Sequence, residues 1–128
     1  MSLTEIMVVI AIIGIVGSVI AVNLFAFLDD AAVDGTKIQI RNMEKGLLAY
    51  ATKHKGKFPS TSEGLDAAKK YFSEDSKVPQ DQWGNNFQYF SPGTHGDHAY
   101  EILSLGKDGK EGGEDANADI YSWAMDGE

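Results

Sequence analysis

The sequence predicts an α+β fold in which one long N-terminal helix carries a small antiparallel sheet. An uncharged apolar run near the N-terminus passes into a stretch whose apolar residues recur at helical spacing. A short helical segment and three stretches rich in aromatic and β-branched residues follow. Helices first and strands afterwards, without regular alternation, is the element order of an α+β domain.

The first half of the predicted long helix is apolar on all sides. Between Ile6 and Leu28 there are 23 residues, and only Ser18 and Asn23 are clearly polar. A helix needs about 20 residues to cross a bilayer, so this run is long enough to span a membrane. A signal peptide fits poorly, because no Lys or Arg precedes the run. The sequence leaves open whether Met1 is the initiator or the N-terminus that remains after a leader is removed.

The second half of the predicted helix is amphipathic. Its apolar stripe is formed by Ile40, Met43, Leu47, Leu48, Tyr50, Ala51 and His54. Gly35 costs only about 1 kcal/mol in a helix interior and does not force a break. We therefore expect one helix from Leu3 to Lys55, roughly 80 Å long. Gly56 is the predicted stop.

The remaining elements are short. Ser60–Glu63 has the pattern of a capping box and predicts a helix over Thr61–Phe72, with Leu65, Ala68 and Phe72 on its inner face. Strands are predicted at residues 87–90, 100–103 and 120–123. Residues 105–119 contain four glycines and five acids, which predicts either an ordered loop or no structure at all.

Length and charge bound the function. The 128 residues allow one sizeable core, so we expect a membrane or filament-core segment at 1–28 and a globular head at 29–128. Residues 58–128 carry 14 acidic against 5 basic side chains, which argues against a nucleic-acid partner. The chain has no cysteine, so no disulfide can stabilise the small head, and a metal is the obvious substitute.

Glu5 is the one ionisable side chain at the start of the apolar run. A carboxylate costs about 2.5–3.5 kcal/mol at the bilayer centre and less near an interface. Glu5 either reaches the lipid headgroups or pairs with the Met1 amine of a neighbouring copy. Such a pair would fix the register between packed apolar helices.

The acid-rich loop is a candidate calcium site. Its oxygen ligands are Asp108, Glu111, Glu114, Asp115, Asn117 and Asp119, and calcium takes six to eight oxygens. Asp115, Asn117 and Asp119 have the first spacings of an EF-hand loop, but Ile120 replaces its glycine and Asp126 replaces its bidentate Glu. The loop is therefore no EF-hand. A solvated acidic loop without metal is the alternative.

The other chemically capable residues form no catalytic pattern. No Cys or nearby His gives the histidines zinc-site spacing, and Ser104 lacks a Gly-x-Ser-x-Gly context. The two tryptophans are expected to pack in or against the core. The residues in question are His54, His95, His98, Ser104, Trp83 and Trp123. We therefore expect no enzyme and no small-molecule substrate.

Several motifs resemble the type IV pilin-like proteins, and among them the major pseudopilins of the type II secretion system. The matching stretches are Leu3–Val9, Phe58–Pro59, Ser62–Leu65, Asp81–Asn85, Tyr89–Gly93 with His95–Gly96, Ser104–Gly109, Gly112–Glu114 and Ala118–Ile120. The sequence departs from the family at three positions. Met1 replaces the usual Phe, Val22 replaces a Pro, and Gln82 replaces the Pro of Asp-Pro-Trp-Gly.

The resemblance implies a structural subunit that polymerises into a periplasmic pseudopilus driving type II protein secretion. Its N-terminal segment would hold it in the bacterial inner membrane as a single pass, with the head in the periplasm. Its partners would be copies of itself, minor pseudopilins and the inner-membrane secretion platform. Met1 would be N-methylated and would pair with Glu5 of a neighbour.

The resemblance also implies an ordered C-terminal loop that binds one structural Ca²⁺. The implied ligands are the Leu105 carbonyl and the side chains of Asp108, Asp115, Asn117 and Asp119. Two rival functions remain at this point: a type IV pilus major pilin forming a surface fibre, and a monomeric membrane-tethered periplasmic calcium-binding module. Trp83-Gly84 and the loop favour the pseudopilin over the pilin. A tethered monomer would have no use for Glu5 beside the N-terminus.

Overall fold

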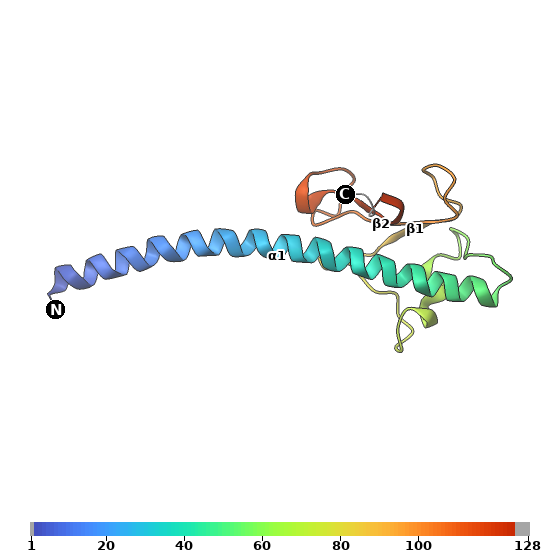
Figure 1. Cartoon of the computed structure of the whole chain (residues 1–128), viewed down its shortest axis with the longest axis horizontal. Helices are drawn as coiled ribbons and strands as arrows, with labels where there is room; N and C mark the ends of the chain where they lie inside the picture. Colours follow the sequence, from blue (N-terminus) through green and yellow to red (C-terminus); the bar gives the residue numbers. More distant parts are fainter. Residues whose placement is uncertain (1, 125–128) are drawn as a thin grey trace. The chain divides into compact units, whose positions relative to one another are not determined.

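The computed structural model describes residues 2–124 and divides the chain after Ala31 into two compact units. We call residues 2–31 the arm and residues 32–124 the head. The elements are α1 (Leu3–Lys53), η1 (Leu65–Tyr71), β1 (Gln88–Phe90), β2 (Glu101–Ser104), η2 (Asp115–Asn117), β3 (Ile120–Tyr121) and η3 (Ser122–Ala124), where η is a 3₁₀ helix. The long helix and small sheet confirm the predicted α+β class (Figure 1).

The arm is helical from its predicted start at Leu3. Every residue from 2 to 28 is exposed, and the large apolar side chains range from 41% exposure at Ile6 to 78% at Leu3. This part of α1 is long and apolar enough to cross a membrane, with a mean hydropathy of 2.7 in its most apolar window. Within the described residues, no side chain between positions 2 and 28 is buried.

In the head, α1 buries one stripe, as the spacing predicted. Ile40, Met43 and Leu47 are almost fully buried, and Tyr50 and Ala51 continue the stripe. The prediction was wrong for two members: Leu48 is 62% exposed and His54 lies on the surface. Successive residues of an α-helix are rotated by about 100° about its axis, so the Leu48 side chain points away from the buried stripe that contains Leu47. His54 follows the last helical residue and stacks on the Tyr50 ring, 3.8 Å between centroids.

The end of α1 confirms Gly56 as the stop signal. The helix ends at Lys53, slightly before the predicted Lys55, which already has a positive φ of 61°. Gly56 takes a φ of 81° and donates its N–H to the Ala51 carbonyl at 2.7 Å. The same carbonyl also accepts the His54 N–H at 3.0 Å, and together the two hydrogen bonds close the end of the helix.

The predicted α-helix over Thr61–Phe72 is instead a turn followed by the 3₁₀ helix η1. The capping-box contacts do form, since the Glu63 N–H donates to Ser60 Oγ at 3.3 Å and the Ser60 N–H donates to Glu63 Oε1 at 3.2 Å. Gly64 then adopts a φ of 67° and a ψ of −172°, which interrupts the helix before Leu65. Leu65 and Ala68 face the core as predicted.

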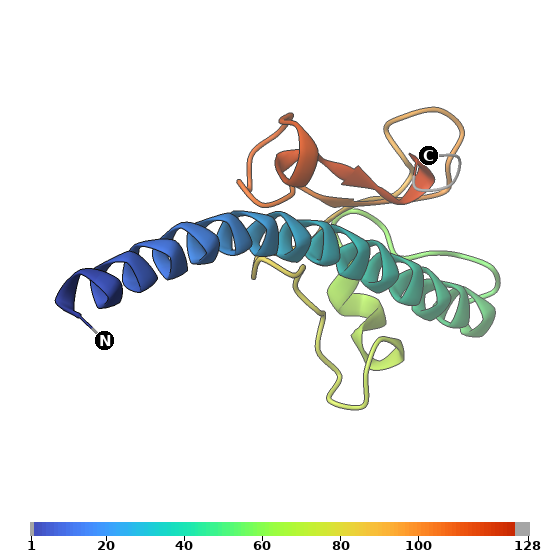
Figure 2. The ribbon, with the colours of Figure 1, turned by 60° about the vertical axis from the view of Figure 1, so that its left-hand side comes forward.

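The three strands lie where the sequence predicted and form an antiparallel sheet in the order β1-β2-β3. Tyr89 pairs with Ile102, and Ser104 pairs with Ile120. The third strand is shorter than expected because the chain turns into η3, whose Ser122 Oγ accepts the Ile102 N–H at 3.0 Å. Within the head, the sheet lies on one side of α1 and η1 on the other (Figures 1 and 2).

Candidate functional site

The N-terminus of α1 is closed by a capping box. The Glu5 N–H donates to Ser2 Oγ at 3.2 Å, and the Ser2 N–H donates to Glu5 Oε2 at 3.4 Å. Both side chains are exposed. Met1, the predicted partner and modification site, lies outside the described residues.

The sequence analysis missed this local role of Glu5. Its signal, Ser2-x-x-Glu5 directly before an apolar helix, is the same pattern that was recognised at Ser60–Glu63. A capping box satisfies backbone N–H groups at the start of a helix. Glu5 therefore has a structural task in its own chain, beside any task between chains.

Residues 105–119 form an ordered loop, which decides between the two expectations for this segment. The Lys107 N–H donates to the Ala116 carbonyl at 2.8 Å, which closes the loop on itself. Gly106 and Gly113 have φ angles of 79° and 102°, and a Cβ at either would come within 2.8 Å of Asn117 backbone atoms. The close approach across the loop therefore requires glycine at both positions.

The five predicted calcium ligands lie in this loop, where the side chains of Asp115 and Asp119 line a common hollow. Within residues 2–124, no three His, Cys, Asp or Glu side chains lie together in an arrangement that would hold a metal. Asp108 is exposed and its Oδ1 accepts the Lys110 N–H at 3.1 Å. Asp115 and Asn117 are exposed at the two ends of η2, and Leu105 is half-buried.

Asp119 is the predicted ligand that fits a cation best. Its Oδ2 accepts the Gly112 N–H at 3.1 Å, whereas its Oδ1 is buried and has no hydrogen-bond partner. A buried carboxylate oxygen without a partner is costly, and a bound cation would remove that cost. Asp119 Oδ1 is therefore the predicted ligand atom whose burial and missing hydrogen bond favour a bound Ca²⁺.

Asp81 connects this loop to the rest of the head and was not recognised as important from the sequence. It is only 5% exposed, and its Oδ1 accepts the N–H groups of Trp83 and Asn85 at 3.1 and 2.9 Å. Its Oδ2 accepts the Ser104 hydroxyl at 2.8 Å, and Ser104 Oγ in turn accepts the Gly106 N–H. Asp81 thus fixes the start of the acidic loop. Its position before Trp-Gly-Asn was visible in the sequence, but its partner strand was not.

Glu101 organises the loop between β1 and β2. Its carboxylate accepts hydrogen bonds from the Thr94 hydroxyl at 2.7 Å and from the His95 N–H, and His95 Nδ1 lies 3.1 Å from Oε1. Burial alone would raise the pKa of Glu101, but these hydrogen bonds outweigh it and hold the pKa below the ordinary value. His95 and His98 pack on Trp123, which confirms a packing role for this tryptophan, at the surface.

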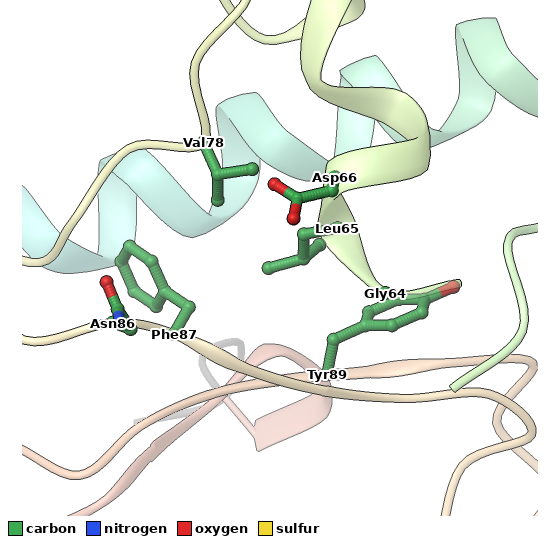
Figure 3. Close-up of a pocket in the computed structure, with 7 residues that line it drawn as sticks. All are labelled: Gly64, Leu65, Asp66, Val78, Asn86, Phe87 and Tyr89. Carbon is green, nitrogen blue, oxygen red and sulfur yellow. The ribbon is translucent and has the colours of Figure 1, made fainter. Parts of the chain in front are cut away.

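A hollow of about 310 Å³ lies between η1 and β1 (Figure 3). Its lining is mixed: Leu65, Val78 and Phe87 face one another, and polar groups of the surrounding residues Asp66, Asn86 and Tyr89 complete it. The other titratable side chain of the lining is Tyr89, and its hydroxyl donates to the Pro59 carbonyl at 2.7 Å instead of pairing with Asp66. We therefore interpret this hollow as a gap in the packing between η1 and β1.

Comparison with known proteins gives a consistent result. The family model described as "Type II secretion system (T2SS), protein G" matches residues 23–123. The type II secretion system core protein G of Pseudomonas aeruginosa is 37% identical over 95% of this chain and 92% of that protein. The corresponding protein of Escherichia coli is 35% identical over 97% and 90%.

A solved structure agrees with these relatives. The crystal structure of the major pseudopilin from the type 2 secretion system of enterohaemorrhagic Escherichia coli superposes with a TM-score of 0.63 and 27% identity, covering 80% of this chain and 96% of that one. The long apolar helix, the three-stranded sheet and these matches point the same way. The chain belongs to the type II secretion system protein G family, the structural pseudopilins of that system.

Proposed function

We propose that this chain polymerises with copies of itself into a periplasmic pseudopilus, and that the arm anchors it in the inner membrane beforehand. In this proposal it acts together with minor pseudopilins and the inner-membrane platform of the secretion system, as a structural component and not as an enzyme. The single observation that carries the proposal is the arm, whose residues 2–28 are all exposed.

The apolar area of the arm supports both states. Burying one Val, Leu, Ile or Phe side chain contributes about 1.5–3 kcal/mol, and the arm exposes such side chains on every face. Lipid tails can cover this surface in the membrane, and packed copies of the same helix can cover it in a filament. Because every face of the arm is apolar, lipid tails or neighbouring helices can cover any of them.

Glu5 is proposed to select the position of the next copy. In lipid its carboxylate would lie near the interface, where its cost is modest. In the filament it would pair with the N-terminal amine of a neighbouring copy, in addition to its capping contact with Ser2. A charged pair surrounded by apolar helices tolerates little displacement, so it would fix the stagger between copies.

The experiment compares three variants of the full chain in cells that carry the secretion system. Glu5→Ala and Glu5→Gln should remain in the inner-membrane fraction but form no filaments in electron micrographs. Ser2→Ala is the matched control, because it removes the capping hydroxyl and keeps the charge. Normal filaments from Glu5→Ala would overturn the proposal, and a loss as complete in Ser2→Ala would reassign Glu5 to helix capping.

We propose in addition that the loop at 105–119 binds one structural Ca²⁺. The buried, unpartnered Oδ1 of Asp119 supports this proposal. Asp108, Asp115, Asn117 and the Leu105 carbonyl would complete the ligand set. When bound, the ion would cross-link the loop, in a head that has no cysteine with which to do so.

Calcium binding can be measured through the two tryptophans, since Trp83 and Trp123 both belong to the head. In the detergent-solubilised full chain, millimolar Ca²⁺ should raise the melting temperature reported by their fluorescence. Asp119→Ala should abolish the rise, whereas Asp66→Ala, an exposed acid on η1, should retain it. An unchanged melting temperature with calcium would contradict the site.

A further inference from the structure

We propose that the head has two oppositely charged poles, and that the acidic pole of one copy docks on the basic pole of the next. The proposal rests on the proposed polymerisation and adds to it a contact between heads. It concerns residues of the head only. The partner it identifies is a second copy of this chain.

The basic pole lies at the end of α1. Lys53, Lys55 and Lys57 are exposed there and, together with one acid, Glu63, line a hollow of about 420 Å³. The floor of the hollow is the stacked pair of Tyr50 and His54. Among the described residues, none of the three ammonium groups forms an ion pair. This pole therefore offers positive charge beside an aromatic surface.

The acidic pole is the outer part of the 105–119 loop. Asp108, Glu111, Glu114 and Asp115 are exposed on it, with Lys107 and Lys110 as the basic residues of the same segment. Glu111 and Glu114 lie outside the ligand set proposed above for Ca²⁺, so their charge remains available whether or not the loop holds an ion. The loop is fixed from beneath by the Asp81–Ser104 hydrogen bond.

The two poles cannot neutralise each other within one head. Asp115 and Asp119 share a hollow with Val33 and Lys37, near the start of the head's part of α1. Lys53 lies 16 residues further along the same helix, or about 24 Å at 1.5 Å per residue. This exceeds the screening length of about 8 Å at physiological salt. Figures 1 and 2 show the loop and the helix end at opposite ends of the head.

Two different complementary patches on one molecule define a head-to-tail contact. Such a contact leaves one pole unoccupied at each end, so it repeats from copy to copy instead of closing on a dimer. It therefore suits a filament. A two-fold contact between antiparallel heads would also pair opposite charges, but it would close on a dimer and could not extend further.

The absence of cysteine from the chain allows a direct test. Lys57→Cys and Glu114→Cys, combined in the full chain and expressed with the secretion system, should give a ladder of disulfide-linked multimers on a non-reducing gel. Either cysteine alone should give no ladder, because a chain with one thiol can link at most two copies. Lys69→Cys with Glu114→Cys is the matched control, since Lys69 is an exposed lysine on η1, and it should give no ladder.

A second measurement does not depend on cysteine. Glu114→Lys and Lys57→Glu should each reduce filament yield, and the double variant should restore it by re-forming the pair with inverted signs. Filaments that assemble without a 57–114 ladder and without rescue would overturn the docking contact and leave the proposed function intact. If the unmodified chain formed no polymer, both proposals would be wrong.

Discussion

The two halves of α1 differ in where their apolar side chains go. Leu24 in the arm is 51% exposed, whereas Leu47 in the head is fully buried. Both belong to one continuous helix of 51 residues. The head half is covered by its own sheet and by η1, so its fold is specified by this chain alone. In the arm half, residues 2–28 are all exposed, and in the proposed function lipid or other copies cover them.

This difference separates two kinds of stability. Contacts in the head determine whether the subunit folds, and contacts of the arm determine where it resides and whether it assembles. A substitution can therefore harm one without the other. The predictions that follow use this separation, beginning with the largest expected effect.

A Leu→Ala truncation should impair folding in the head half of α1 and assembly in the arm half. Leu47→Ala should lower the free energy of unfolding of the head by about 2–5 kcal/mol, because it leaves a cavity in the core. Leu24→Ala should leave the unfolding of the head unchanged and weaken filament formation. Denaturant unfolding followed by tryptophan fluorescence measures the first effect, and electron microscopy of the filaments measures the second.

Either of two results would break the comparison. One is a destabilised head in Leu24→Ala, which would mean that the arm contributes to the core. The other is a fully stable Leu47→Ala. Val33, which is partly buried against the core just beyond the arm, offers an intermediate case.

Asp81 sharpens the comparison within the head. Asp81→Ala leaves three donors without their acceptor, and an unsatisfied buried donor costs about 1–3 kcal/mol. We expect about 2–4 kcal/mol of destabilisation and a weaker response of the head to calcium, because the acidic loop loses its attachment. Asp81→Asn keeps an acceptor oxygen and should cost less. Equal stability of wild type and Asp81→Ala in chemical denaturation would refute this role.

The smallest expected effect is the dependence of the head's stability on acidic pH. The pKa of Glu101 in the folded head lies below its ordinary value of 4.5, so its carboxylate stabilises the fold at pH values above that. This stability is lost as the pH falls from about 4.5 through the lowered folded-state pKa. In a plot of the free energy of unfolding against pH, Glu101→Gln should therefore reduce the fall below about pH 4.5. Glu74→Gln, which changes an exposed acid, is the control and should not reduce it. An identical fall in Glu101→Gln would contradict the assignment.

Local patterns were sufficient to predict most of the fold. The spacing of Ile40, Met43 and Leu47 predicted the buried stripe, and Gly56 predicted the end of the helix. Both signals act over a few residues, so the sequence displays them directly. The failure at η1 has the same origin, because the capping box formed as expected but Gly64 adopted a positive φ that the pattern did not reveal.

The candidate site could be predicted only in part. Acidic residues in the 105–119 loop were evident, but the burial of Asp119 Oδ1 depends on how the loop closes on itself. The role of Asp81 depends on Ser104, 23 positions away, on a neighbouring element. Contacts of this kind arise from packing and leave no periodic signal along the chain.

The central claim is that the arm exchanges lipid for copies of itself. Helical reconstruction, by electron cryomicroscopy, of filaments assembled from the full chain tests it most directly. The account predicts that the arms form the filament core and that each Glu5 carboxylate lies within ion-pair distance of a neighbouring copy's N-terminal amine. A filament held together by the heads alone, with the arms outside its core, would contradict it.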